Sequence, residues 1–269
     1  RMRELGLFGH SIPKAYGGPG GNILQISLTG SASSAMNAAH ILYEGMTAED
    51  RGAQPIDSMN DASWRAGADW FYDQGIGLCT AFDPDAETVE QFITRIQTVA
   101  NCSVTKSPTN GQWYLDVANG IYTLGDLPIL TDDNILEFSD KPTVLDDMVN
   151  SLSVEYFDVL TKAVTTTPPI QALSLVTTNG LHHTVKQYHE IPAGPLAARI
   201  CQRDLQSLIT PTRVFTMTTT RKPYSWRRST YFRLQAPKRG ITDLVCTLAQ
   251  KSSGTLKSGA MSITAVPDT

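Results

Sequence analysis

Three acidic side chains, Asp83, Asp85 and Glu87, have the alternating spacing with which a calcium-binding loop begins. The sixth position of such a loop requires glycine and the twelfth requires glutamate, but these positions hold Thr88 and Thr94. Acidic residues also favour the start of a helix, because its free amides and its dipole attract negative charge. We therefore expect these carboxylates to introduce a helix rather than to bind calcium.

His182, His183 and His189 are three potential metal ligands that lie close together in the sequence. On one strand His183 and His189 would be about 20 Å apart at ~3.3 Å per residue, so they cannot share an ion without a bend. His189-Glu190 begins the zinc motif H-E-x-x-H, but the second histidine is replaced by Ala193. The sequence predicts no metal site and no cofactor.

Asp132, Asp133 and Glu137 are the carboxylates that a cell-wall-degrading enzyme would need, since glycosidases act with two facing carboxyl groups. They fall in and just after a predicted turn and show no pairing pattern. The phosphate-binding G-x-x-x-x-G-K-[ST] loop and the G-x-S-x-G nucleophile motif are both absent. We predict a protein that is not an enzyme, with the cell-wall hydrolase kept as an alternative.

Residues 221–233 mix cations with aromatic side chains, a combination that suits phosphate contacts and base stacking. A nucleic-acid-binding module is therefore a second alternative. Acidic runs at 44–90 and 116–158 offer this basic segment a protein partner, and this favours a contact between subunits or domains. The expected interface residues are Arg221, Lys222, Trp226, Arg227, Arg228 and Arg233.

The elements that must position these residues are short. Thr88 and Gln91 form a capping-box pattern before an apolar stripe, which predicts a helix over 88–100 anchored on an adjoining sheet by Phe92 and Ile96. Asn110-Gly111 predicts a hairpin of 102–107 and 111–118, with Trp113 on its apolar face. Further helices are expected over 35–46, 61–73 and 195–209, the last with Leu205 inward, and strands over 213–221, 230–236 and 243–250.

The fold class that these elements predict is α+β, rich in antiparallel strands, with several short amphipathic helices. We expect three parts: an N-terminal segment (1–83) with two short helices, a β-rich region (84–250), and a C-terminal tail (251–269) with a possible strand. No apolar run reaches the ~18 residues of a membrane helix, so no membrane span is expected.

The composition agrees with a packed protein. The chain of 269 residues has 41% hydrophobic and 18% charged residues, with a formal net charge of −4. Its four cysteines, Cys79, Cys102, Cys201 and Cys246, are scattered and mostly flanked by apolar residues, which predicts free thiols in a reducing compartment such as the cytosol.

Several segments match known motifs in a fixed order between residues 36 and 250. Met36–Glu44 (MNAAHILYE) resembles N-P-A-H-I-I-Y-E, with Ala38 in place of proline, and Asn60–Asp69 (NDASWRAGAD) is similar to D-D-A-S-F-x-A-A-A-D. Ala197–Leu205 (AARICQRDL) is similar to A-N-R-L-A-A-R-D-L. These are motifs of the tail-tip attachment proteins of bacteriophages and prophages, the baseplate hub or central-fibre proteins of long-tailed phages.

This resemblance implies β-barrel or sheet units like those of the tail tube, and a structural part in the tail tip. It implies a homo-trimeric hub that closes the distal end of the tail tube and supports host attachment. The implied partners are other phage tail proteins and, indirectly, a bacterial surface receptor; nucleic acid is not expected. The protein would be located in the virion tail, assembled in the host cytoplasm. Members of this family are longer, so we expect a fragment or a short hub.

Overall fold

The computed structural model describes residues 24–28, 31–141, 148–210, 213–254 and 259–268. These residues form short helices and mainly antiparallel sheets, so the predicted α+β class is confirmed. Two strand pairs, β8 with β11 and β6 with β13, are parallel, and the other pairs are antiparallel. No helix in these ranges is long and apolar enough to cross a membrane.

The chain divides into two compact units. Unit 1 contains the described residues of Arg1–Cys102 and Asp146–Ile209, and unit 2 those of Ser103–Leu145 and Thr210–Thr269. This division does not follow the boundaries expected at residues 83 and 250. The chain leaves unit 1 and returns to it, because later segments complete its core: the Cys79 amide donates to the Glu190 carbonyl at 2.8 Å.

Three helices form one part of unit 1: α1 (Ala38–Thr47), α2 (Asp61–Asp73) and α3 (Val89–Ala100). Helix α1 packs against both others and is buried along nearly its whole length. The helix expected from residue 35 begins only at Ala38, because Asn37 caps it by accepting a bond from the Ala39 amide at 2.9 Å. The preceding residues belong to a small sheet of β1 (Leu24–Leu28), β2 (Ser31–Asn37) and β3 (Gly77–Leu78).

Helix α3 begins at the predicted capping box and buries Phe92 and Ile96 completely. Its partner differs from the one expected: α3 packs on α1 rather than on a sheet. Gly45 of α1 permits the close approach, since a Cβ there would lie 3.2 Å from the Phe92 ring. The apolar stripe predicts that a face is buried, but it does not specify what covers that face.

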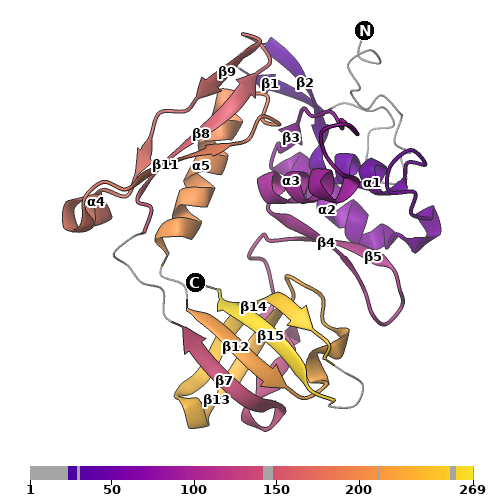
Figure 1. The fold of residues 1–269 in the computed structure, drawn as a ribbon, viewed down its shortest axis with the longest axis vertical. Coiled ribbons are helices and arrows are strands. Elements are labelled where there is room, and N and C mark those ends of the chain that lie inside the picture. Colours follow the sequence, from indigo (N-terminus) through magenta and orange to yellow (C-terminus); the bar gives the residue numbers. More distant parts are fainter. Residues whose placement is uncertain (1–23, 29–30, 142–147, 211–212, 255–258, 269) are drawn as a thin grey trace. The chain divides into compact units, whose positions relative to one another are not determined.

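The second part of unit 1 is a sheet with β8 (Ser151–Asp158) at its centre. Helix α5 (Gly194–Ile209) runs beside β8 and covers one face (Figure 1). The first four residues of β8, Ser151 to Val154, are all buried, as is Leu205 of α5. The remaining elements are β9 (Ala163–Thr166), β10 (Ile170–Gln171), α4 (Leu173–Asn179) and β11 (His183–Gln187).

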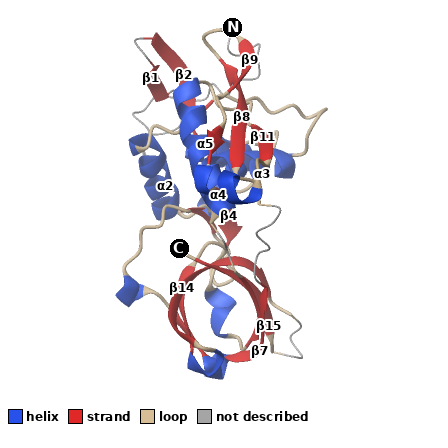
Figure 2. Ribbon diagram, turned by 90° about the vertical axis from the view of Figure 1, so that its left-hand side faces the viewer, coloured by secondary structure: helices blue, strands red, loops and turns tan. Residues whose placement is uncertain are grey.

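Unit 2 is built on a six-stranded sheet with the strand order β6-β13-β14-β15-β12-β7. The sheet curls into a ring, as Figure 2 shows. Its terminal strands β6 and β7 are joined by only the three residues of the 3₁₀ turn η5 (Asp132–Asn134), so the chain itself connects the two ends. The strands are β6 (Ile129–Thr131), β7 (Ile135–Lys141), β12 (Val214–Thr219), β13 (Tyr231–Ala236), β14 (Ile241–Ser252) and β15 (Met261–Pro267).

The ring surrounds a core of alternating inward side chains, including Phe215, Phe232 and Leu248. The predicted hairpin is also present, as β4 (Cys102–Lys106) paired with β5 (Trp113–Val117). Four further 3₁₀ turns are η3 (Ile56–Ser58), η4 (Leu124–Asp126), η6 (Lys222–Ser225) and η7 (Pro237–Arg239).

Candidate interaction surface

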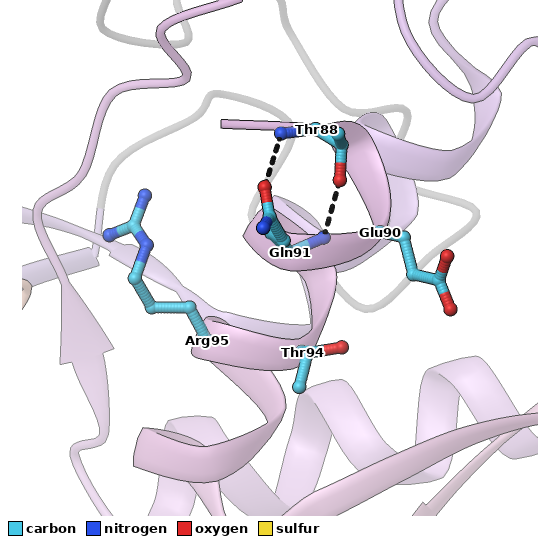
Figure 3. A pocket seen from close by; sticks show the side chains of 5 residues that line it. All are labelled: Thr88, Glu90, Gln91, Thr94 and Arg95. Carbon is cyan, nitrogen blue, oxygen red and sulfur yellow. Dashed lines mark hydrogen bonds between the residues drawn. The ribbon is translucent and has the colours of Figure 1, made fainter. Parts of the chain in front are cut away.

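An open hollow of about 530 Å³ lies on the N-terminal half of α3 (Figure 3). Thr88 and Gln91 satisfy each other there: the Gln91 amide donates to Thr88 Oγ1 at 3.2 Å, and the Thr88 amide donates to Gln91 Oε1 at 2.8 Å. The other lining residues are Glu90, Thr94 and Arg95. The cap thus satisfies two of the backbone amides at this helix end, those of Thr88 and Gln91.

Arg95, the one cation of this hollow, is held by two carboxylates. It donates to Glu87 Oε1 at 2.5 Å and to Thr80 Oγ1 at 3.1 Å, and it contacts buried Glu190. Burial lowers the pKa of Arg95, but the hydrogen bonds to Glu87 and Glu190 outweigh that effect and raise it above its ordinary value. The one cation among the lining residues of this hollow is therefore already neutralised.

The other candidate ligands have separate structural partners. Asp83 Oδ1 accepts from the Asp85 amide at 3.0 Å in a turn that precedes Thr88, the residue that caps α3. His183 Nδ1 lies 2.9 Å from Ser151 Oγ, and His189 Nε2 lies 2.9 Å from Glu155 Oε1. Within the described ranges, no three His, Cys, Asp or Glu side chains are arranged to hold a metal ion.

The carboxylates considered for hydrolysis likewise form contacts that stabilise the fold. Asp132 accepts from the Lys238 amide at 3.0 Å and forms an ion pair with Arg239. Glu137 Oε2 accepts from Thr218 Oγ1 at 2.9 Å on the neighbouring strand. These bonds fix η5 and β7 in the ring, and Asp133 remains exposed beside them.

Three of the six expected interface residues are engaged inside unit 2. Trp226 is buried and stacks on Phe232 with ring centroids 5.0 Å apart. Arg233 forms an ion pair with Asp243 on β14, and this hydrogen bond raises the pKa of Arg233 and lowers that of Asp243. The third is Arg227.

Arg227 fastens the β4–β5 hairpin to the ring. Its Nε and Nη2 donate to the two carboxylate oxygens of Asp116 at 3.0 and 2.9 Å. Its guanidinium carbon lies 4.0 Å from the centroid of the Tyr114 ring. The hydrogen bond to Asp116 raises the pKa of Arg227, so the group stays charged at any physiological pH. The acidic partner expected for this segment is thus found, for Arg227, within the same unit.

The other three expected residues, Arg221, Lys222 and Arg228, are exposed. Together with Tyr224, whose side chain is 43% exposed, they form what we call the basic tip, on and beside η6. Lys251 supports it by donating to the backbone carbonyls of Tyr224 at 2.9 Å and Trp226 at 2.5 Å. Burial lowers the pKa of Lys251.

The residues predicted to anchor the core differ in how deeply they are buried. Phe92 and Ile96 are fully buried and Leu205 is 4% exposed, whereas Trp113 is only half-buried on the hairpin. Lys106 Nζ lies 5.5 Å from the centroid of the Trp113 ring. Trp113 is therefore a surface partner of a cation rather than a core residue.

All four cysteines are free thiols, as predicted. Burial raises the pKa of Cys79 to about 11 and the pKa values of Cys102 and Cys246 to about 12. Thiolates are the reactive form of cysteine, so these side chains are chemically inert at neutral pH.

One buried charge cluster has no signal in the sequence. Asp204 of α5 accepts from Lys186 Nζ at 2.8 Å, from the Tyr188 hydroxyl at 2.7 Å and from Arg203 Nη2 at 2.7 Å. Burial raises the pKa of Asp204, but these donors outweigh it, and the pKa lies below its ordinary value. Arg203 also donates to the Val99 carbonyl at 2.9 Å, which joins α5 to the end of α3.

No protein-family model matches this sequence, and no curated protein matches it. Among solved structures, a chain of the virion of a native gene transfer agent particle matches with a TM-score of 0.62 at 10% identity, over 87% of this chain and 48% of that one. The two chains share a fold.

Two tail proteins match with lower structural similarity. One is from Neisseria meningitidis MC58, with a TM-score of 0.44 at 15% identity over 71% of this chain and 57% of that one. The other is from prophage MuSo2 of Shewanella oneidensis, with a TM-score of 0.43 at 14% identity over 70% of this chain and 55% of that one. This chain spans about half the length of the solved chains that it matches.

Proposed function

We propose that this chain is a structural component of a phage tail or tail-like particle. The observation that carries the proposal is the fold shared with a chain of the gene transfer agent virion, which includes 87% of this chain. The curled six-stranded sheet of unit 2 agrees with it, since the resemblance implies β-barrel or sheet units like those of the tail tube (Figure 2). The motifs that resemble tail-tip attachment proteins support the same assignment independently.

The finer role that we propose is that of a hub at the tail tip. Three copies would close the distal end of the tail tube, contact other tail proteins and support attachment to a bacterial receptor indirectly. Closed rings of identical subunits are a common solution in such assemblies. The chain would be assembled in the host cytoplasm, where its four free thiols remain reduced.

The role is not catalytic. In the hollow on α3, the capping residues Thr88 and Gln91 hydrogen-bond to each other and Arg95 pairs with Glu87. In the ring, the carboxylates of Asp132 and Glu137 hydrogen-bond to neighbouring residues. A structural role requires rigidity rather than reactive groups. The engagement of these charged side chains in contacts within the fold agrees with such a role.

The test is to locate the protein in the particle. A tagged full-length protein would be expressed in cells that produce the particle, and purified particles would be imaged with a label against the tag. We expect label at one end of the tail and three-fold density there in averaged images. Particles without the label, or label distributed along the tube, would contradict the hub role; the first result would also contradict a structural role in the particle.

A further inference from the structure

The basic tip carries exposed cations that have no carboxylate partner among the described residues of unit 2. Each other arginine of the described residues contacts a carboxylate or a backbone carbonyl, as Arg227, Arg233 and Arg199 do. Arg221 and Arg228 have no such contact within the described part of the chain, and neither has Lys222. Exposed cations at one place, next to an exposed tyrosine, are typical of a protein interface, where aromatic residues and arginine are enriched.

Two contacts hold the backbone of the tip in one conformation, which favours binding. Trp226 anchors it in the core of the ring, and Lys251 fixes two of its backbone carbonyls. A preformed loop loses little conformational entropy when a partner binds, so more of the contact energy appears as affinity.

The C-terminal half of α2 has the opposite property. Asp69 and Asp73 are exposed, four residues apart on one helix face, with Tyr72 beside them at 56% exposed. Like charges at this spacing destabilise a helix, and a negative charge in its last turn also opposes the helix dipole. We call these three residues the acidic face of α2.

Among the described residues of unit 1, no cation forms an ion pair or a hydrogen bond with Asp69 or Asp73. The last turn of α2 has no basic residue, and Arg65 pairs with Asp61 near the start of the helix. Arg199 lies near the end of the helix but donates to the Gln74 carbonyl at 2.8 Å, and not to either aspartate. The sequence thus retains two unfavourable charges that a cation from a partner would stabilise.

We propose that the basic tip of one copy docks on the acidic face of α2 in a second copy of this chain. Arg221, Lys222 and Arg228 would contact Asp69 and Asp73, with Tyr224 against Tyr72. This deepens the proposed structural role, on which it rests, by naming the two surfaces through which copies join. Because the surfaces differ, the contact is heterologous, and repeated application produces a ring or a filament rather than a simple symmetric dimer.

Charge reversal on either surface tests the contact. We compare Arg221→Glu/Arg228→Glu, Asp69→Lys/Asp73→Lys and the combination of all four in the full chain, by sedimentation velocity over a range of protein concentrations. Each pair alone should weaken self-association at least tenfold, because it opposes like charges. The combination should restore association to within about threefold of wild type. Added salt should weaken the wild-type contact, since exposed charges are screened.

Mixing gives a sharper result. The tip-reversed variant is acidic at both surfaces and the face-reversed variant is basic at both, so each alone should associate weakly, whereas an equimolar mixture should form assemblies in which the two variants alternate. Lys238→Glu and Asp85→Lys are the matched controls, because they reverse exposed charges outside both surfaces and should leave association unchanged. Asp69→Lys/Asp73→Lys should also raise the melting temperature, so lost association cannot be attributed to unfolding.

The proposal is overturned if wild type is monomeric throughout, if the controls weaken association as much as the reversals, or if the combination fails to restore it. It is also overturned if the tip binds a DNA duplex, with a steep salt dependence that tip reversal removes, while copies do not associate. If one of these results is obtained while the tagged wild-type protein is still found in purified particles, only this contact is rejected and the proposed structural role remains.

Discussion

The charged residues of this protein fall into two groups with opposite environments. Around Asp204 in unit 1, one carboxylate accepts hydrogen bonds from Lys186, Tyr188 and Arg203. At the basic tip of unit 2, Arg221 and Arg228 are exposed without a carboxylate. The first arrangement holds elements of the fold together. The charged side chains of the second remain available to form ion pairs with another molecule. Charge type alone does not separate these roles, because both groups contain arginine and lysine.

The largest loss of unfolding free energy should come from a substitution in the apolar interior, and the effects of the two charge groups can be compared with it. Phe92→Ala removes a fully buried ring between α3 and α1 and should cost ~3–5 kcal/mol of unfolding free energy. Thr94→Ala, on the exposed face of the same helix, should change it by less than about 0.5 kcal/mol. Urea denaturation measures both. A small loss for Phe92→Ala would mean that α3 does not pack as described.

The satisfied charge cluster should come next. Asp204→Asn removes charge-assisted hydrogen bonds from a buried site and should cost ~1–3 kcal/mol at neutral pH. The pKa of Asp204 is lowered from its ordinary 3.8, so its stabilisation is complete above that pH and is lost as the pH falls toward the folded-state pKa. The difference between wild type and Asp204→Asn should therefore shrink below pH 3.8 in acid denaturation. A difference that stays constant with pH would show that the charge is unimportant.

Two adjacent arginines then test the contrast within one segment. Arg227→Ala removes the bidentate contact with Asp116 and the stacking on Tyr114, and should cost about 1–2 kcal/mol. Arg228→Ala removes an exposed side chain and should stay within about 0.5 kcal/mol. Thermal unfolding of the two variants distinguishes them. Equal losses would mean that Arg228 also has a structural partner.

The smallest expected effect is on catalysis. The purified chain should not clear peptidoglycan, since Asp132 and Glu137 each hydrogen-bond to a neighbouring residue of unit 2. Turbidity of a peptidoglycan suspension is the measurement, with lysozyme as the positive control. Clearing that Asp132→Ala or Glu137→Ala abolishes would restore the hydrolase alternative.

Local signals in the sequence were enough for many elements. The capping box at Thr88, the Asn-Gly turn and the alternating runs predicted α3, the hairpin and most strands of the ring, because each depends on neighbours within a few residues. Long-range pairing was not predictable in this way. The parallel pairing of β8 with β11 and the return of the chain to unit 1 depend on partners far apart in sequence.

The interface candidates show the same limit. Composition identified the basic segment 221–233, but it could not show that Asp116 lies opposite Arg227 or that Trp226 points into the core. Those facts follow from a strand order that no local pattern contains. The helix boundary at Ala38 was missed for a related reason, since helical spacing continued upstream into residues that pair with β1.

The join between β6 and β7 has a mechanical consequence for the ring of unit 2. The ladder between β6 and β13 has three residue pairs, whereas that between β7 and β12 has six. A force that widens the ring acts on every pair of neighbouring strands. The pair with the fewest paired residues therefore separates first. The seam at β6 then parts while β7 keeps its partner, and η5 tethers the loosened strand. Under tension the ring would therefore open at one defined place and could reclose from a strand that never diffuses away.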